Sequence, residues 1–319
     1  MKKFLSICLS LLFCLSCTGC GHSIIGDGIP EKDGITIVTT NFFLYDTART
    51  LARPEDEVIM LISPGTESHD YELTLADMAL IETCDLFAYV GGEGEGWVYD
   101  ALDAFAENGI EIPAFCAMEA VEEAGTLCHT AGEHDHDHGE HEHSHWEGID
   151  DHVWLSVPNA IVIHEAMLDT LKGYYENWTP DDSVKYSLVT LDEKFRALVS
   201  SAENPEILIA DRFPFAYLTN EYGIAYTAAF EGCSSDTEAS LETIHMLIGK
   251  AQSLGQGVIL VTELSDCQTA EAVAAQTADL KIAELHSCHN VTKEDFDAGV
   301  TYIDLMERNY AVLETLWKQ

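Results

Sequence analysis

The sequence predicts an α/β protein with two parallel-sheet lobes that are joined by a long, rigid helix. Short apolar segments bounded by turn residues alternate with helical patterns in residues 34–115 and again in residues 206–285. This alternation is typical of βαβ units in a mostly parallel sheet. Two long helical patterns separate the two series. With 319 residues, 47% of them hydrophobic, the chain is large enough for two lobes with buried cores.

The first series contains strands rich in β-branched residues, each followed by a turn or a helix. We expect strands at residues 34–40 (GITIVTT), 56–62 (DEVIMLI), 85–90 (DLFAYV) and 110–115. Helical patterns cover residues 73–83 and 97–107, and the glycine-rich GGEGEG precedes the second of them. These elements define an N-terminal lobe at residues 34–178.

Two long helical patterns follow the first series of strands, and after them the alternation of strands and helices begins again. Helical patterns at residues 157–178 and 181–202 are separated by Thr179-Pro180, where proline suits a helix start, so residues 179–203 are expected to form the linking helix. The C-terminal lobe, residues 204–319, should contain strands at 206–210, 224–230, 257–262 and 280–285. Its helices are expected from Pro214, at 237–254, at 268–277 and, as a closing helix, at 293–317.

The N-terminus reads as an export signal. Two lysines and an apolar run precede small residues and Cys20, and Thr18-Gly19-Cys20-Gly21 looks like a bacterial lipoprotein cleavage site, with Cys17 where Leu is usual. Residues 1–19 would be removed, Cys20 would carry lipid, and residues 20–33 would be a tether. No later stretch is apolar enough to span a bilayer. The sequence therefore predicts a lipid-anchored protein on the extracytoplasmic face of the cell membrane.

The net charge is −41, and removal of Lys2 and Lys3 with the signal leaves 13 bases and 56 acids, or −43. Between Arg53 and Lys172 there are 28 acids and neither Lys nor Arg. Such a field repels nucleic acid and anionic substrates and attracts cations.

Residues 129–152 (HTAGEHDHDHGEHEHSHWEGIDDH) hold 8 of the 14 histidines, 8 carboxylates and no Lys or Arg. Imidazole beside carboxylate favours borderline divalent metals, zinc first. The tract has no helix or strand period, so we expect a loop at residues 129–145. Its auxiliary metal-binding histidines are His129, His134, His136, His138, His141, His143 and His145.

Metal-ligating residue types also follow the predicted strands. Because the carboxyl ends of parallel strands face one edge, where ligands bind, these residues are candidates for one site in a cleft between the lobes. They are His69, Asp211, Glu231, Glu263 and His286, joined by His152 at the mouth of a helix.

Two strings, SPGTESHDYELTLADMALIETCDLFAYVGGEGEGW and DDHVWLSVPNA, match a known family. With them, the chain resembles the zinc and manganese solute-binding lipoproteins of bacterial ABC importers (cluster A-I). The first string carries the family's histidine between Pro-Gly and Tyr-Glu. DDHVWLSVPNA is similar to its Asp-Pro-His-Val-Trp-Leu-Ser-Pro block, with Asp151 in place of the first proline. FAYLTNEYGI, GCSSDTEAS and TYIDLMERNYAVLETLW fit the C-terminal lobe. The acidic His-rich loop is a mark of the zinc-specific branch.

The resemblance implies a C-clamp of two lobes with one metal ion between them. His69 and His152 match family ligands, but the third ligand position falls on Arg212, which cannot ligate; Asp211 is a possible substitute. The fourth falls on His286 or nearby, which gives a site of His69, His152, His286 and one oxygen from Asp211 or Glu263. Zn²⁺ is the expected ion, with Mn²⁺ as the alternative. The expected partner of the monomeric protein is an ABC permease.

Six cysteines remain after the signal: Cys84, Cys116, Cys128, Cys233, Cys267 and Cys288. None has CxxC spacing. Cys267 and Cys288 follow the last two predicted strands, whose ends could lie side by side, and a Cys267–Cys288 pair resembles a disulfide of some zinc-specific members. Thiolate ligation of a metal is the alternative.

The histidine-rich sequence also leaves two alternative functions, a zinc hydrolase and a surface zinc store or adhesin. A zinc hydrolase needs an open coordination position and a general base, but the nearest string to HExxH is HGEHEH, in the His-rich tract rather than on a helix. No nucleophile elbow or P-loop appears either. A surface zinc store or adhesin would bind metal mainly through the tract.

Overall fold

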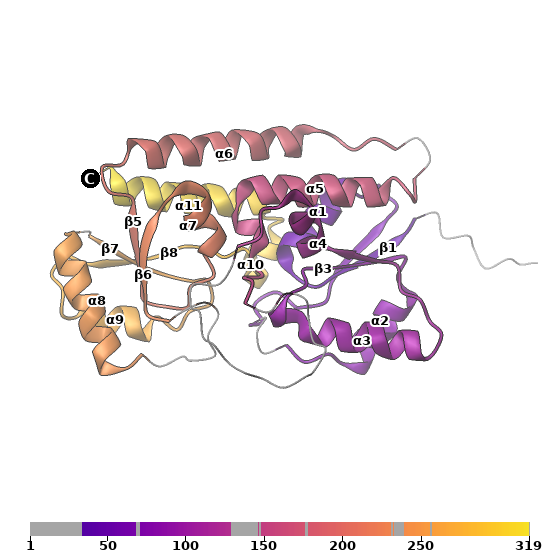
Figure 1. The fold of residues 1–319 in the computed structure, drawn as a ribbon, viewed down its shortest axis with the longest axis horizontal. Helices are drawn as coiled ribbons and strands as arrows, with labels where there is room; N and C mark the ends of the chain where they lie inside the picture. Colours follow the sequence, from indigo (N-terminus) through magenta and orange to yellow (C-terminus); the bar gives the residue numbers. More distant parts are fainter. Residues whose placement is uncertain are drawn as a thin grey trace, which may run out of the picture. The chain divides into compact units, whose positions relative to one another are not determined.

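Two four-stranded parallel sheets organise the fold, as the sequence predicts (Figure 1). The computed structural model describes residues 34–67, 71–128, 146, 148–175, 178–230, 232, 239–255 and 257–318. Each sheet has helices on both of its faces. The inner strands β1, β3, β5 and β7 are fully buried, as expected for parallel strands covered on two sides, whereas the edge strands β2, β6 and β8 are half-buried or exposed.

The first sheet has the strand order β2-β1-β3-β4. Its strands are β1 (Thr36–Thr39), β2 (Glu57–Met60), β3 (Leu86–Tyr89) and β4 (Ala114–Cys116). Its helices are α1 (Phe42–Leu51), α2 (Leu75–Thr83), α3 (Gly96–Glu107) and α4 (Ala117–Ala124), with a 3-10 turn η2 (Glu93–Glu95) before α3. In Figure 1, α2 and α3 lie on one face of this sheet and α1 on the other.

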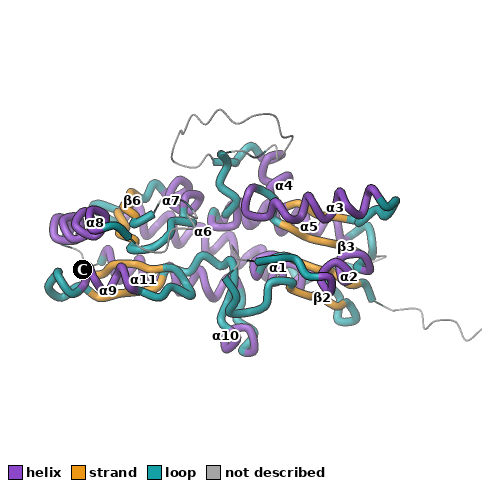
Figure 2. The backbone as a smooth tube through the Cα atoms, turned by 90° about the horizontal axis from the view of Figure 1, so that it is seen from below, coloured by secondary structure: helices purple, strands orange, loops and turns teal. Residues whose placement is uncertain are grey.

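The second sheet has the order β6-β5-β7-β8. Its strands are β5 (Glu206–Ile209), β6 (Ala225–Ala228), β7 (Val258–Val261) and β8 (Lys281–Glu284). Its helices are α7 (Ala216–Tyr222), α8 (Leu241–Leu254), α9 (Gln268–Ala274), α10 (Lys293–Asp297) and α11 (Tyr302–Trp317). Helices α8 and α9 pack against each other on one face of this sheet, and α11 lies on the other face (Figure 1), while Figure 2 shows the same elements seen from below.

Both sheets have the same topology, because the first strand of each series is flanked by the second strand on one side and the third on the other. The crossovers change direction between β1 and β3 and between β5 and β7. Such a switch point opens a crevice at the carboxyl ends of the two strands, where ligands bind in open parallel sheets. A binding site is therefore expected after β1 and β3 and after β5 and β7.

Between the sheets in the chain come η3 (Val153–Leu155), α5 (Val157–Leu171) and α6 (Ser183–Ser201). Helix α6 packs against α5 and also against α7 and α11. One continuous cluster of buried apolar residues includes Phe87 of the first sheet, Phe195 of α6 and Ile207 of the second sheet. A smaller cluster fills the space between the second sheet and helices α8 and α9. That α6 acts as a rigid connector stays a prediction.

Several helices begin where a short polar side chain caps the first turn, which explains their positions in the sequence. The capping side chain accepts a hydrogen bond from a backbone N–H two or three residues into the helix. These caps are Asn41, Thr74, Ser156, Ser240, Thr292 and Thr301.

The expected single closing helix at residues 293–317 is wrong. The chain breaks between α10 and α11, where Gly299 adopts a left-handed φ of 73° and Thr301 forms a capping box with Asp304. The break lets Tyr302 N donate to Asp46 Oδ2 of α1 at 2.7 Å. Burial raises the pKa of Asp46. Helices α1 and α4 were not predicted, and α5 ends at Leu171 rather than at residue 178.

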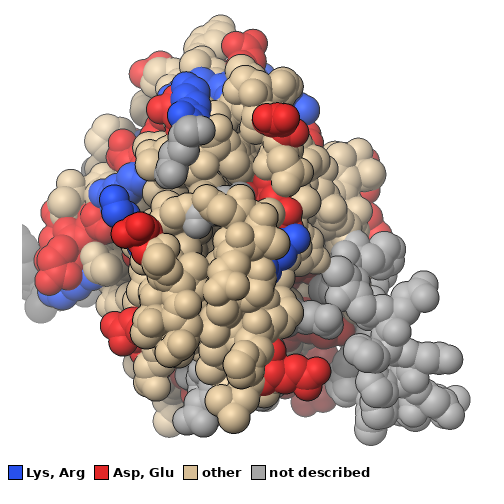
Figure 3. All heavy atoms as spheres, turned by 90° about the vertical axis from the view of Figure 1, so that its left-hand side faces the viewer, with Lys and Arg blue, Asp and Glu red and all other residues tan. Residues whose placement is uncertain are grey.

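Charge is distributed unevenly over the molecule. Ten of the 15 Lys and Arg residues lie from Lys172 onward. On the side that carries the second sheet, acidic and basic side chains lie around a wide area of uncharged residues (Figure 3). Among the residues that the structure describes, no helix combines the length and the apolar content needed to cross a membrane.

The buried His164 on α5 predicts an acid-sensitive contact between α5 and α6. Neither ring nitrogen has a hydrogen-bond partner among the described residues, and burial lowers the pKa of His164 below the ordinary 6.5, while Glu165 raises it, Lys185 lowers it and Asp182 raises it. The unfolded chain thus takes up this proton more readily than the folded one, and stability should fall as the pH drops below 6.5.

We expect His164→Leu to raise the free energy of unfolding by on the order of 1 kcal/mol at neutral pH, because an unsatisfied buried polar group is removed. It should also weaken the loss of stability between pH 7.5 and pH 5. Urea unfolding at both pH values measures this. His245→Leu, at an exposed position of α8, is the matched control. Equal pH dependence in the wild type and in His164→Leu would refute the interpretation.

Candidate metal centre

The predicted site residues divide into those that the structure describes and those outside it. His69, Glu231, Cys20 and Cys233 lie outside the described residues, and so do the seven auxiliary histidines His129, His134, His136, His138, His141, His143 and His145. His152, Asp211, Glu263 and His286 are described. The contacts of these four residues define the described part of the site.

His152 is 1% exposed and stands immediately before η3. Its Nδ1 lies 3.1 Å from Asp150 Oδ1 and 2.9 Å from Asp151 Oδ1. An ionised carboxylate only accepts, so this pairing places the proton on Nδ1 and the lone pair on Nε2. Carboxylates that hold a ligating histidine in this way fix its tautomer and raise its basicity. His152 is therefore held by carboxylates in the way that a metal-binding histidine commonly is.

These three side chains are one group of potential ligands, with atoms within 4.8 Å of each other in the described part of the chain. The geometry argues against a metal ion among them, because both carboxylates face the same nitrogen and form ion pairs with it. We interpret Asp150 and Asp151 as the groups that orient the imidazole.

The glycine-rich GGEGEG segment makes room for Asp151. Gly94 N donates to Asp151 Oδ2 at 3.2 Å, and a Cβ atom added at Gly94 would lie 2.4 Å from that oxygen. Gly92 has a φ of 85°, and a Cβ there would lie 2.7 Å from Asp151 Cβ. Only glycine permits this close approach at both positions. The segment thus holds the carboxylate that holds His152.

The buried carboxyl of Glu95 stabilises the same glycine-rich segment through backbone hydrogen bonds. It is 5% exposed, and its Oε2 accepts hydrogen bonds from Val90 N at 2.7 Å and Gly91 N at 3.0 Å. Burial raises the pKa of Glu95 to about 7, against the lowering effect of these hydrogen bonds. The carboxyl fixes the turn that follows β3, next to the switch point of the first sheet.

A pocket lies where segments that follow strands of both sheets meet. It includes His152, His289, Glu263, Arg212 and Glu67. The remaining lining residues are Thr66, Pro214, Thr262, Leu264, Ser287 and Asn290. Arg212 comes soon after β5, and Glu263 soon after β7, so the pocket opens at the switch point of the second sheet, as predicted.

The two predicted acids have different roles. Glu263 lines the pocket, and its Oε2 accepts from Ser287 N at 2.7 Å while Oε1 accepts from the Ser287 hydroxyl. Asp211 turns toward its own segment: it accepts from Arg212 N at 2.8 Å and from Thr262 Oγ1 at 2.9 Å. Asp211 lines an adjoining pocket with Glu67, Arg212 and Asp266. The structure therefore brings Glu263, and not Asp211, to the pocket of His152.

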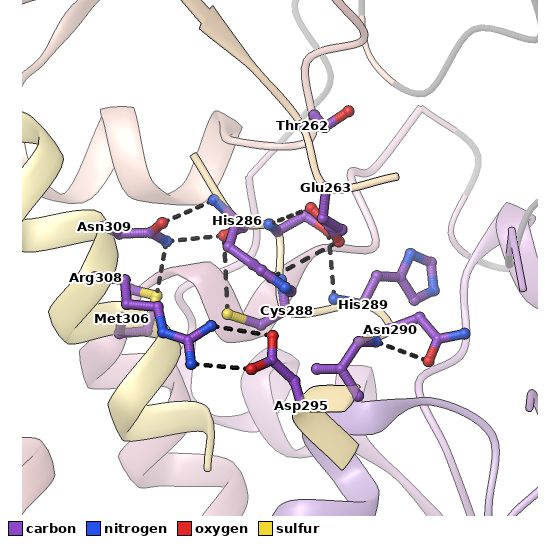
Figure 4. A network of polar contacts seen from close by, with 12 residues as sticks. Thr262, Glu263, His286, Cys288, His289, Asn290, Asp295, Met306, Arg308 and Asn309 are labelled. Carbon is purple, nitrogen blue, oxygen red and sulfur yellow. Dashed lines mark hydrogen bonds and ion pairs between the residues drawn. The ribbon is translucent and has the colours of Figure 1, made fainter. Parts of the chain in front are cut away.

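His286 does not line the pocket of His152. It is 3% exposed, and its backbone exchanges hydrogen bonds with the side chain of Asn309 on α11 (2.7 and 2.8 Å). Its Nδ1 accepts from Cys288 N at 2.9 Å, so the lone pair that a metal would need is engaged (Figure 4). The described geometry gives His286 a structural role in the loop after β8.

His289 lines the pocket of His152, whereas His286, which was predicted as a ligand, does not. Its ring centroid lies 5.5 Å from that of His152 at an interplanar angle of 88°, and 5.3 Å from that of Trp154. In Figure 4 its side chain points away from the His286 network. The string HSCHN contains both histidines, and His286 was predicted because it directly follows the strand. Only the path of the loop distinguishes them.

The favoured Cys267–Cys288 disulfide is wrong, because both thiols are free in the structure. Cys267 stands before α9 with its Sγ 3.7 Å from Ser265 O, whereas Cys288 is fully buried with its Sγ 3.8 Å from His286 O. Both lie several residues past the ends of β7 and β8, where strand pairing no longer determines neighbours. Burial raises the pKa of Cys288 well above its ordinary value, which disfavours thiolate ligation.

The chain is similar to known proteins over nearly its whole length. The chain is 30% identical over 330 residues to the high-affinity zinc uptake system protein ZnuA of Bacillus subtilis, across 98% of this chain and 97% of that protein. It is 29% identical over 323 residues to the zinc-binding lipoprotein AdcA of Streptococcus pneumoniae, where it covers 98% of this chain but 61% of the relative's length.

The fold is similar to the crystal structure of the Zn(II)-bound ZnuA-like domain of Streptococcus pneumoniae AdcA. The TM-score is 0.70 at 26% identity, and the match covers 90% of this chain and 100% of that domain. The family model described as "Zinc-uptake complex component A periplasmic" matches residues 37–316. The chain therefore belongs to this family of periplasmic zinc-uptake components, as its sequence motifs predicted.

Proposed function

We propose that the protein captures Zn²⁺ outside the cytoplasmic membrane and delivers it to the permease of an ABC importer. The observation that carries the proposal is the pair of imidazoles, His152 and His289, in one pocket lined by segments from both sheets. Two neutral imidazoles with a nearby carboxylate suit Zn²⁺, whereas sites made only of oxygen suit Ca²⁺ or Mg²⁺. Zinc uptake by related proteins supports the same conclusion.

We assign His152 and His289 as ligands, with Glu263 as an oxygen donor beside them. His69 is a further proposed ligand, since it follows Glu67, which lines the pocket, by two residues. The carboxylates of Asp150 and Asp151 would stabilise His152 as Zn²⁺ binds to it. Release to the permease would follow when the two lobes separate and the ligands that they contribute move apart.

The His-rich tract would act as a collector that feeds this site. It begins directly after Cys128, whose carbonyl accepts a 3.1 Å hydrogen bond from Asp150 N, two residues before His152. Many equivalent ligands tethered this close raise the local metal concentration. Lipid on Cys20 would keep a monomeric protein beside its permease, and a relative that is named a lipoprotein supports this anchor. A hydrolase is not supported, because the relatives reported above are metal-uptake or metal-binding proteins.

Metal titration by calorimetry tests the site. The protein would start at Gly21 and lack residues 133–145, with Trp146 retained because it is buried and donates to Tyr99 Oη at 3.1 Å. We expect one tight Zn²⁺ site, weakened by more than roughly 100-fold in His152→Ala and in His289→Ala, since even outer-shell changes cost about 10–100-fold.

His286→Gln is the matched control, because it keeps an acceptor for Cys288 N while removing the imidazole. It should leave the affinity unchanged. If His286→Gln abolishes binding and His289→Ala does not, the ligand assignment is wrong. If the protein without residues 133–145 has no tight site at all, metal binding resides in the tract, as the zinc-store alternative requires.

The support of His152 by Asp151 predicts an effect at a residue without any side chain. We expect Gly94→Ala to lower the zinc affinity by roughly 10–100-fold, because the new Cβ displaces the carboxylate that holds His152. Gly96→Ala is the control: Gly96 has a helical φ of −49°, and an added Cβ there meets no atom within 4 Å. Equal zinc affinities for the two variants would exclude this role for Asp151.

A further inference from the structure

An ion pair between the two lobes lies in the wall of the proposed metal pocket. Arg212 Nη2 donates to Glu67 Oε2 at 3.1 Å, although the two residues are 145 positions apart in the sequence. The side chains are 21% and 34% exposed. Arg212 belongs to the segment after β5, and Glu67 to the segment after β2. Both residues line the pocket of His152 and the adjoining acidic pocket, so the pair stands between the two.

Among the described residues, two carboxylates line the pocket of His152, and both are held by donors of the protein. The two oxygens of Glu263 accept hydrogen bonds from the backbone and hydroxyl of Ser287. Glu67 accepts from Arg212, a cation that stays charged at any physiological pH. The imidazoles of His152 and His289 face the same pocket. An incoming ion therefore meets two imidazoles, while the carboxylate of Glu67 is engaged by Arg212.

Divalent ions respond differently to this arrangement. Imidazole suits Zn²⁺, whereas Mn²⁺ favours carboxylate, carbonyl and water oxygens in a larger coordination sphere. A pocket that offered the carboxylate of Glu67 freely would therefore gain more affinity for Mn²⁺ than for Zn²⁺. The positive charge of Arg212 alone would repel both ions equally, since both are divalent.

We propose that Arg212 is a specificity-determining residue that withholds the Glu67 carboxylate from the metal and so favours Zn²⁺ over Mn²⁺. The inference rests on the proposed function, since it concerns the same pocket. This role accounts for the presence of an arginine at a position where the family resemblance implies a metal ligand. Arg212 acts through Glu67 and does not itself bind the ion.

The test compares Zn²⁺ and Mn²⁺ affinities in a double-mutant cycle of Arg212→Met and Glu67→Gln. Methionine keeps the length of the side chain and removes its charge. We expect Arg212→Met to strengthen Mn²⁺ binding by about tenfold more than Zn²⁺ binding. In the double variant the wild-type ratio of the two affinities should return, because Glu67 is then gone. Arg212→Lys, which keeps a cation beside Glu67, should change the ratio much less.

The outcomes separate this inference from the function on which it rests. Absence of a tight Zn²⁺ site in the wild-type protein would overturn the proposed function itself. A tight Zn²⁺ site whose Zn²⁺-to-Mn²⁺ ratio is the same in Arg212→Met would overturn only the role of Arg212. An equal gain for both ions in Arg212→Met would show that charge repulsion, and not ligand withholding, is the effect. Far-UV circular dichroism confirms that each variant is folded.

Discussion

The indole N–H of Trp154 donates a 2.7 Å hydrogen bond to the carbonyl of Ser287, and this bond joins two of the segments that line the proposed metal pocket. Trp154 is 1% exposed and follows His152 by two residues. Its own carbonyl accepts from the Tyr302 hydroxyl at 2.6 Å. A buried indole N–H needs a partner, and here that partner is a backbone group on the loop after β8. The segment of His152 and the segment of His289 are thereby held together.

Further bonds attach the same loop to the first lobe. Phe42 N donates to His289 O at 2.9 Å, which fixes the backbone of the proposed ligand against the start of α1. Asn290 is 2% exposed and donates to Ser63 O at 2.9 Å and to Thr66 O at 2.8 Å. Removing a buried amide of this kind leaves two carbonyls unsatisfied, at about 1–3 kcal/mol each. The loop that precedes His69 is thus positioned by the residue next to His289.

The sequence predicted much of this architecture because its signals are local. Strands such as β1 and β7 are continuous apolar runs, and β-branched residues bounded by glycine mark them clearly. The break between α10 and α11 was missed although Gly299 and the capping box of Thr301 with Asp304 are local signals. What the sequence does not reveal is the contact of the new N-terminus at Tyr302 with Asp46, which is more than 250 positions away. Helix α4 and the exact ends of α5 depend on packing in the same way.

The site was predictable in kind but not in every residue. Glu263 was identified from its place after a predicted strand, and His152 from its place at the mouth of a helix; both line the pocket. His286 and His289 are equivalent by composition, and the choice between them depends on which ring the loop turns inward. Asp211 was predicted as an oxygen donor to the metal, but in the structure its carboxylate accepts hydrogen bonds from Arg212 N and Thr262. The spacing of residues along the sequence does not reveal in which direction each side chain points in the fold.

In this strongly acidic protein, whose proposed metal pocket contains an arginine, the attraction of cations and the choice between them depend on different features. The net charge of −41 draws in every cation, but it is screened over about 8 Å at physiological salt and does not distinguish one divalent ion from another. Discrimination has to come from the type and number of donor atoms at short range. Arg212 lowers the attraction locally, yet it also holds Glu67 in an ion pair. In a chain that already concentrates cations, some affinity can be given up at the pocket for a choice between ions.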